Sequence, residues 1–190
     1  DTETGEKVGV LIPKQENVKI IEGSWQVSGL AGSGSKDIEF KDVFIPKKYI
    51  RSGPKSSEWG GKKAGVINSA TYRLSQISTK PFTLAAVSVG VAGGVLEAFT
   101  QRMKEQHSRF GDDLSEKQSI QLRIAESAAE YDAARKILLT DIRESLKILI
   151  EKEDIPEEMH HRNRRDMAFC PRLAQASVDR LFYAAGAGGL

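Results

Sequence analysis

Adjacent histidines and arginines form the most conspicuous group of potential ligands in the 190-residue sequence. His160 and His161 are consecutive, so on a helix their rings point about 100° apart and cannot share a metal ion without further ligands. Together with Arg162, Arg164 and Arg165 they are expected to form a solvated basic face. The sequence therefore predicts no metal site.

Two other reactive residue types have structural explanations. Asp112 and Asp113 precede a predicted helix, where the positive end of the helix dipole stabilises carboxylates, and we favour this role over general acid or base catalysis. Cys170 has apolar neighbours, Met167 and Phe169 among them, which should raise the pKa of the thiol and keep it unreactive. Because HExxH, CxxC, GxSxG, P-loop and helix-opening GxGxxG motifs are also absent from the sequence, the catalytic residues are unknown.

A basic segment has the arrangement that a phosphate would need. Basic residues between Arg102 and Arg109 stand just before a helix that we expect to begin at Ser115. Helix N-termini present backbone N–H groups to anions, and a guanidinium beside them would complete the site. A basic helix end without a ligand is the commoner alternative.

Short apolar runs alternate with turn residues between residues 7 and 46, a pattern typical of β structure. Pro13, Gly23 and the glycine- and serine-rich segment 29–35 supply the turns. We expect a piece of antiparallel β structure that is too small to be stable alone. The apolar runs are Val8–Ile12, Val18–Ile21, Trp25–Val27 and the alternating pair Ile38 and Phe40.

After Pro81 the apolar residues recur at helical spacing, so a first helix is expected there. Three glycines inside it, Gly90, Gly93 and Gly94, each cost about 1 kcal/mol relative to alanine, which close helix packing should offset. The predicted buried stripe consists of Leu84, Val87, Val91, Val95 and Phe99.

Two more helices should complete an antiparallel arrangement of three. The second begins at Ser115, which has capping-box spacing to Gln118, and runs to about Glu151. The third follows a turn at 151–158 and runs to Tyr183, with a kink or a restart at Pro171. A fourth helix or another subunit should cover this bundle. The apolar positions of the second helix are Ile120, Ile124, Ala128, Tyr131, Ala134, Leu138, Ile142, Leu146 and Leu149.

Composition argues against several function classes. Lys and Arg number 28 against 26 acids, and the formal net charge of +2 is too weak to indicate a nucleic-acid partner. No apolar stretch is expected to reach the roughly 18 residues of a membrane span. The single cysteine excludes an internal disulfide and no signal peptide is recognised, so we expect a cytoplasmic protein.

Several segments resemble enzymes with the acyl-CoA dehydrogenase-like fold. Residues 23–46, with Trp25, the Gly-Ser-Gly-Ser sequence at 32–35 and the Asp-Val-Phe-Ile-Pro sequence at 42–46, are similar to the end of the middle β-domain in the two-component (group D) flavin-dependent monooxygenase branch. Residues 81–99 resemble the first helix of the C-terminal bundle, and the Arg-Phe-Gly sequence at 109–111, Gln118 and residues 176–188 follow in the family's order.

The resemblance implies an α+β, mainly α, fold. It would combine the end of an antiparallel β-barrel domain (1–50), a linker (51–80) and an incomplete antiparallel helix bundle of the acyl-CoA dehydrogenase C-terminal type (81–190). The chain is then expected to be a C-terminal fragment of a larger enzyme.

The resemblance also implies a site for reduced flavin, FAD or FMN, between the β-domain and the bundle, with help from a neighbouring subunit. The substrate pocket would be lined by Ser78, Thr79 and Lys80, for which helix capping and a solvated charge are the alternative roles. Two positions depart from the dehydrogenase pattern, which has arginine at His107 and glutamine at Phe182. The positions that match cofactor contacts are His107, Ser108, Arg109, Phe110, Gln118, Gly186 and Gly188.

The function implied by the resemblance is hydroxylation of an aromatic small molecule with O2 and reduced flavin from a separate flavin reductase. Acyl-CoA dehydrogenation is one alternative, and a non-catalytic helical assembly fragment is another. A homo-oligomer is expected, as a dimer of dimers.

Overall fold

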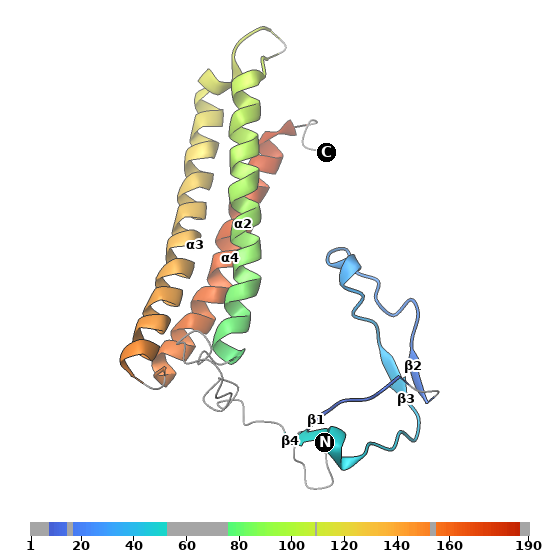
Figure 1. Ribbon diagram of the computed structural model, residues 1–190. Helices are drawn as coiled ribbons and strands as arrows, with labels where there is room; N and C mark the ends of the chain where they lie inside the picture. The colour runs from blue at the N-terminus through green and yellow to red at the C-terminus, as the bar shows by residue number, and fades with distance from the viewer. Residues whose placement is uncertain (1–7, 15–16, 53–75, 109, 153–154, 187–190) are drawn as a thin grey trace. The chain divides into compact units, whose positions relative to one another are not determined.

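The computed structural model describes residues 8–14, 17–52, 76–108, 110–152 and 155–186 (Figure 1). Chain contacts divide the protein into two units, Asp1–Pro54 and Lys55–Leu190. The first unit contains short strands and the second contains long helices. The expected combination of a small antiparallel β portion and a larger helical portion is confirmed.

The first unit consists of two antiparallel ribbons. Strand β1 (Val8–Val10) pairs with β4 (Ile50–Ser52), and β2 (Val18–Ile20) pairs with β3 (Ile38–Phe40). The strands described between residues 8 and 52 do not close into a barrel. The sequence did not reveal β4, which begins at the expected domain boundary and continues into the expected linker.

Trp25–Val27 was wrongly predicted to be strand-like, because local contacts organise this segment as a loop. The Trp25 indole N–H donates a hydrogen bond to the carbonyl of Leu30 at 3.1 Å. Leu30 has a left-handed backbone with φ of 58°, and its carbonyl also accepts from the Ser33 hydroxyl at 2.8 Å. These turns satisfy backbone groups that a strand would need for pairing.

The described part of the second unit holds the three predicted long helices, which alternate in direction (Figure 1). They are α2 (Gln76–Glu105), α3 (Gln118–Glu151) and α4 (Glu157–Ala184). Helix α2 begins five residues before Pro81, earlier than expected. Helix α4 runs through Pro171 without restarting.

The prediction that Ser115 forms a capping box at the start of α3 is wrong. Ser115 lies in a separate 3-10 helix, η4 (Leu114–Glu116), and α3 begins only at Gln118. Lys117 occupies the N-cap position and makes no side-chain cap hydrogen bond. The side chain of Gln121 instead reaches back to donate to the Ser115 carbonyl at 2.9 Å.

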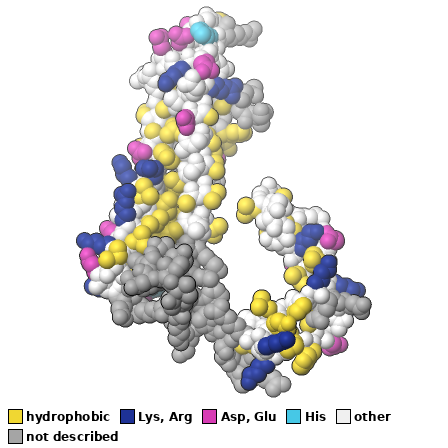
Figure 2. Space-filling view, viewed as in Figure 1, with side chains coloured by type: hydrophobic (Ala, Val, Ile, Leu, Met, Phe, Trp, Pro, Cys, Tyr) yellow, Lys and Arg dark blue, Asp and Glu magenta, His cyan; other side chains and the backbone are white. Residues whose placement is uncertain are grey.

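The buried face predicted for α2 is confirmed at Phe99, with Val95 packed against the same core cluster, but it is wrong over the first half of the helix. Leu84, Val87 and Val91, from the predicted stripe, are 70%, 66% and 55% exposed. Apolar residues surround most of α2, so their spacing alone did not reveal which face packs inward. Hydrophobic side chains are visible along the exposed bundle surface in Figure 2. The buried positions on α2 are Phe82, Ala85, Val89, Ala92, Phe99 and Met103.

The same helix passes a membrane-span criterion, contrary to the expectation from sequence. Phe82–Glu105 is long and apolar enough to cross a membrane by length and composition, with a mean hydropathy of 1.7. Its Phe82, Ala85 and Val89 nevertheless pack into one core cluster with residues of α3 and α4. A core helix of a helical bundle has these properties as well.

Helices α3 and α4 meet along a seam of small and polar residues. Ser127 and Ser177 donate to each other's backbone carbonyls at 3.2 and 3.0 Å, and the thiol of Cys170 contacts the Ala134 carbonyl at 3.4 Å. Burial raises the pKa of this thiol, as expected. Small side chains let the two backbones approach closely enough for these bonds.

The α3 prediction is partly confirmed, because Ala134, Leu138 and Leu149 are buried. The sequence analysis missed the polar residues of the same face, which pair across the seam. The amide of Asn163 donates to the Ser145 hydroxyl at 2.8 Å. The residues missed are Ser127, Asp141 and Ser145.

Ion pairs flank the seam near both ends. Arg180 binds Glu130 through two hydrogen bonds and Glu126 at 3.1 Å. Arg162 binds Glu144 and, at 3.0 Å, the buried carboxylate of Asp141. The expectation that Arg162 belongs to a solvated basic face is therefore wrong.

Helix α2 meets α3 where Gly93 faces the ring of Tyr131. A methyl group on Gly93 would lie 2.9 Å from this ring, whereas a methyl group on Gly94 would meet nothing within 4 Å. Gly93 therefore permits this close approach, as expected for one of the three helix glycines.

A pair of glycine substitutions tests this contact. We expect Gly94→Ala to stabilise the bundle by up to about 1 kcal/mol through helix propensity. Gly93→Ala should destabilise it by about 1 kcal/mol, because the Tyr131 ring must move. Urea unfolding followed by circular dichroism measures both changes. With Tyr131→Ala in the background the two substitutions should become equivalent, and equal effects with Tyr131 intact would contradict the contact.

Candidate functional site

The connection between α2 and α3 folds back on itself as a short hairpin. His107 and Asp113 form a backbone bridge, and their side chains meet with Nε2 2.9 Å from Oδ1. The Ser108 N–H donates to the Asp112 carbonyl at 2.6 Å, and the Leu114 N–H donates to the Gln106 carbonyl at 3.1 Å. These contacts hold His107 and Asp113 beside one another immediately before η4.

The tip of the hairpin is organised by Ser108 and Gly111. The Ser108 hydroxyl accepts the backbone N–H groups of Phe110 at 3.2 Å and Asp112 at 3.0 Å. Gly111 has φ of 89°, which an L-residue rarely adopts. Phe110 is 89% exposed, and Arg109 lies outside the described residues.

The two aspartates of the hairpin bind basic side chains, a pairing that the sequence did not reveal. Asp112 binds Lys117, and this hydrogen-bonded ion pair lowers the pKa of the Asp112 carboxyl. Asp113 binds His107. The first turn of α3 contains no acidic residue, and Gln118, its first residue, is exposed. The start of α3 therefore has no carboxylate within its own first turn, and the acid that precedes it, Glu116, belongs to η4.

The end of α4 lies at the same end of the bundle as this hairpin. Leu181, Ala184 and Ala185 share a core cluster with Leu114 and Ile120, which flank the start of α3. Gly186 follows with φ of 59°, while Gly188 lies outside the described residues. The structure thus brings His107, Ser108, Phe110 and Gln118 to the bundle end that also carries Gly186.

Ser78, Thr79 and Lys80 lie far from this group. All three are inside α2 rather than before it, and their side chains are outside the described part of the structure. About 26 residues of helix separate Thr79 from Glu105, or roughly 40 Å at 1.5 Å per residue. Among the described residues, the predicted substrate and cofactor positions therefore do not form one site.

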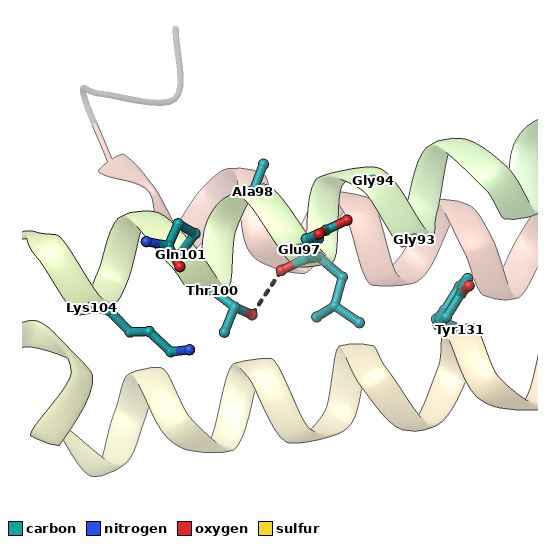
Figure 3. A pocket seen from close by; sticks show the side chains of 9 residues that line it. Gly93, Gly94, Glu97, Ala98, Thr100, Gln101, Lys104 and Tyr131 are labelled. Atoms are coloured by element: carbon teal, nitrogen blue, oxygen red, sulfur yellow. Dashed lines mark hydrogen bonds between the residues drawn. The ribbon is translucent and has the colours of Figure 1, made fainter.

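A shallow groove of about 880 Å³ between α2 and α3 was not predicted (Figure 3). Gly93 and Gly94 leave space at one end, beside the Tyr131 ring. Further along, the exposed side chains of Glu97 and Lys104 line the groove. The adjacent glycines were the only feature of the sequence that indicated a local gap.

Comparison with known proteins identifies the helical unit. Residues 82–190 match the family model described as "Acyl-CoA dehydrogenase, C-terminal domain". The chain belongs to this family. Its match covers all of α3 and α4 and most of α2.

Curated relatives of this acyl-CoA dehydrogenase family member extend the similarity into the β unit. The chain is 31% identical to the flavin-dependent monooxygenase oxygenase subunit HsaA of Mycobacterium tuberculosis, over 95% of this chain and 46% of that protein. It is 29% identical to the oxygenase component of the FADH(2)-dependent resorcinol hydroxylase of Rhizobium sp. (strain MTP-10005), over 95% of this chain and 46% of that protein. The chain therefore spans about half the length of these relatives.

Solved structures agree with this family membership. The 3-HSA hydroxylase from Rhodococcus sp. RHA1 is 28% identical with a TM-score of 0.79, covering 97% of this chain and 47% of that one. XiaF from Streptomyces sp. has a TM-score of 0.81 over 96% of this chain and 46% of that one, and at 18% identity it supports the fold alone.

The hairpin geometry can be tested at Gly111. We expect Gly111→Ala to cost about 1 to 3 kcal/mol locally, because alanine is strained at this backbone angle, and Gly111→Asn to cost less. Hydrogen exchange of the Ser108 and Leu114 amides, which donate across the hairpin, measures local opening. Unchanged protection in Gly111→Ala would contradict the positive φ.

Proposed function

We propose that this chain provides the helix bundle of the oxygenase component of a two-component flavin-dependent monooxygenase. The reaction would hydroxylate an aromatic small molecule with O2 and reduced flavin delivered by a separate reductase. The observation that carries the proposal is the hairpin of His107 to Asp113, placed beside the start of α3 and the end of α4. The names of the relatives, which are oxygenase components, support the same reaction class.

The residues at this bundle end fit the phosphate portion of a flavin. The His107 imidazole is 63% exposed and can carry a positive charge, while Ser108 and Gln118 add polar groups. The acids of the hairpin pair with Lys117 and His107. Backbone N–H groups at the start of α3 provide further donors for a phosphate. We favour FAD over FMN because one relative is described as FADH(2)-dependent.

The bound flavin would supply the redox chemistry, so the role of the protein is to hold it and to exclude water. His107 would donate a hydrogen bond to a phosphate oxygen, in competition with the Asp113 carboxylate that it binds in the structure. Arg109, a neighbour in sequence, is a further candidate donor.

We infer that the protein works as a homo-oligomer, as a dimer of dimers. The exposed apolar residues Leu84, Val87 and Val91 of α2 support this inference, because a contiguous apolar face is stabilised by burial. The separation of roughly 40 Å between Thr79 and the hairpin also supports this inference. In an oligomer, the predicted substrate residues near Thr79 and the predicted cofactor residues of the hairpin would each contribute to a different flavin site.

Flavin binding tests the proposed site directly. We expect His107→Ala to raise the Kd for FAD about tenfold, because a charge-assisted hydrogen bond contributes roughly 1.5 kcal/mol or more. His161→Ala is the matched control, since His161 is also an exposed histidine with an acidic partner, Glu157 at 3.6 Å. Quenching of flavin fluorescence measures both variants with FAD and with FMN. The absence of any flavin binding would favour a non-catalytic assembly role.

Turnover separates the enzyme classes. We expect a hydroxylated aromatic product only when the oxygenase is combined with a flavin reductase, NADH and O2. Chromatography of the products with a panel of phenols checks this outcome. Oxidation of an acyl-CoA with an artificial electron acceptor, in place of hydroxylation, would identify the protein as an acyl-CoA dehydrogenase.

A further inference from the structure

The seam between α3 and α4 has a shape that repeats every seven residues. Six buried positions, three on each helix, recur at this spacing, and four of them carry small side chains. The repeated positions are Ser127, Ala134, Asp141, Asn163, Cys170 and Ser177. A displacement of one helix by seven residues would again place a small residue opposite a small one, Ser177 opposite Ala134 in one direction or Cys170 opposite Ser127 in the other. The packing of small residues is therefore compatible with more than one register.

Buried hydrogen bonds distinguish the register found in the structure. Ser127 and Ser177 donate to each other's backbone carbonyls at 3.2 and 3.0 Å. The amide of Asn163 donates to the Ser145 hydroxyl at 2.8 Å. All four residues are at most 2% exposed, so water cannot replace a bond that is lost.

Either displacement would lose at least one of these bonds. In one direction Leu138 would lie opposite Asn163 in place of Ser145, and the buried amide would have no acceptor there. In the other direction Ala134 would lie opposite Ser177, and alanine has no hydroxyl to donate.

Arg180 marks the same register beside the seam. Its Nε atom lies 3.1 Å from Glu126, and its guanidinium donates twice to Glu130. The two displacements would bring Arg180 opposite Arg123 or Ile137 in place of Glu130. The first arrangement is repulsive, and the second leaves the arginine without a carboxylate.

Arg162 gives the same indication nearer the start of α4. It binds Asp141 Oδ1 at 3.0 Å and also binds Glu144. One displacement would replace both acids by uncharged residues. The other would leave the buried Asp141 without its arginine, although Glu151 would replace Glu144.

Two polar atoms of the seam are present at a cost to stability. Asp141 Oδ2 and Asn163 Oδ1 are buried without a hydrogen-bond partner among the described residues. Apolar side chains of similar size would avoid this cost. In coiled coils a single buried asparagine is retained at such a cost because it excludes other registers.

We infer that the buried polar residues of the seam, with Arg162 and Arg180 beside them, select one register of α3 against α4 from those that the small residues permit. A displacement by seven residues would move α4 by roughly 10 Å along α3, at 1.5 Å per residue. It would remove Leu181 from the cluster that it shares with Leu114 of η4. The selected register therefore determines where α4 ends relative to the hairpin.

The register can be measured as a distance between two spin labels in the whole chain. Lys147 of α3 and Gln175 of α4 are exposed, and Gln175 lies roughly 18 Å along α4 from Asn163, which binds Ser145. Cysteines introduced at these two exposed positions can be labelled, whereas Cys170 is buried and stays unlabelled. Double electron–electron resonance then detects a displacement as a change of roughly 10 Å in the separation of the labels along the helix axis.

We expect one label distance with the seam intact and a second, displaced distance when its polar groups are removed. The polar-free variant carries Ser127→Ala, Ser145→Ala, Asn163→Val and Ser177→Ala. Leu138→Ala is the matched control, because it removes apolar packing from the same face of α3 and should lower stability while keeping the single distance. A folded polar-free variant that keeps the single wild-type distance would overturn the inference, and so would equal splitting in the control.

A milder variant decides the question if circular dichroism shows that the polar-free chain does not fold. Asn163→Val with Arg180→Glu keeps the serine contacts, introduces repulsion from Glu126 and Glu130, and gains attraction to Arg123 in one displaced register. We expect the displaced distance in this double variant, and we expect added Glu130→Arg to restore the single distance. A folded double variant without the displaced distance would overturn the inference.

Discussion

The close approach of α3 and α4 is the constraint on which the rest of the helical unit depends. Ser127 and Ser177 each bind the other's backbone carbonyl, and this reciprocal arrangement requires the two backbones to lie within one small side chain of each other. Cys170 and Ala134 repeat the contact further along the seam. Because a buried hydroxyl without a partner would be costly, these bonds define the relative register of the helices as well as stabilising them. Helix α2 then packs on both helices through Phe82, Ala85 and Val89.

The position of the candidate site depends on the register of α3 and α4, although the hairpin lies outside the seam between them. The seam continues to Leu181, whose cluster joins the end of α4 to Leu114 and Ile120 at the start of α3. The hairpin that pairs His107 with Asp113 is therefore anchored on one side by α2 and on the other by the seam. Its polar groups are exposed because they project from the end of a bundle whose interior is already filled. Such an arrangement suits the binding of a charged ligand, with the rigid helices providing the support.

The sequence was sufficient to predict three long helices, a small antiparallel β portion and the resemblance to acyl-CoA dehydrogenase-like enzymes. It identified Phe99 but not the buried face of the first half of α2, because apolar residues on several sides of that helix give no single direction. The burial of Ser127, Asp141 and Ser145 was not predicted, because only apolar residues were assigned to the buried face of α3. The spacing of the buried small and polar residues nevertheless indicates a helix–helix contact. Ser127, Ala134 and Asp141 are seven residues apart, as are Asn163, Cys170 and Ser177 opposite them, and this heptad repeat is typical of closely packed helix pairs. The pairing of His107 with Asp113 could not be read in the same way, since it depends on how the hairpin folds.

The heptad seam also determines where the chain can change length. The turn between α3 and α4 lies outside the heptad positions, so residues added there, before the buried Ile155, would change the register of neither helix. One residue added inside either helix would instead rotate every later side chain by about 100° and carry the small residues out of the interface. Natural variation in length should therefore concentrate between the end of α3 and the buried Ile155, and a foreign segment such as a label or a tag is best inserted there.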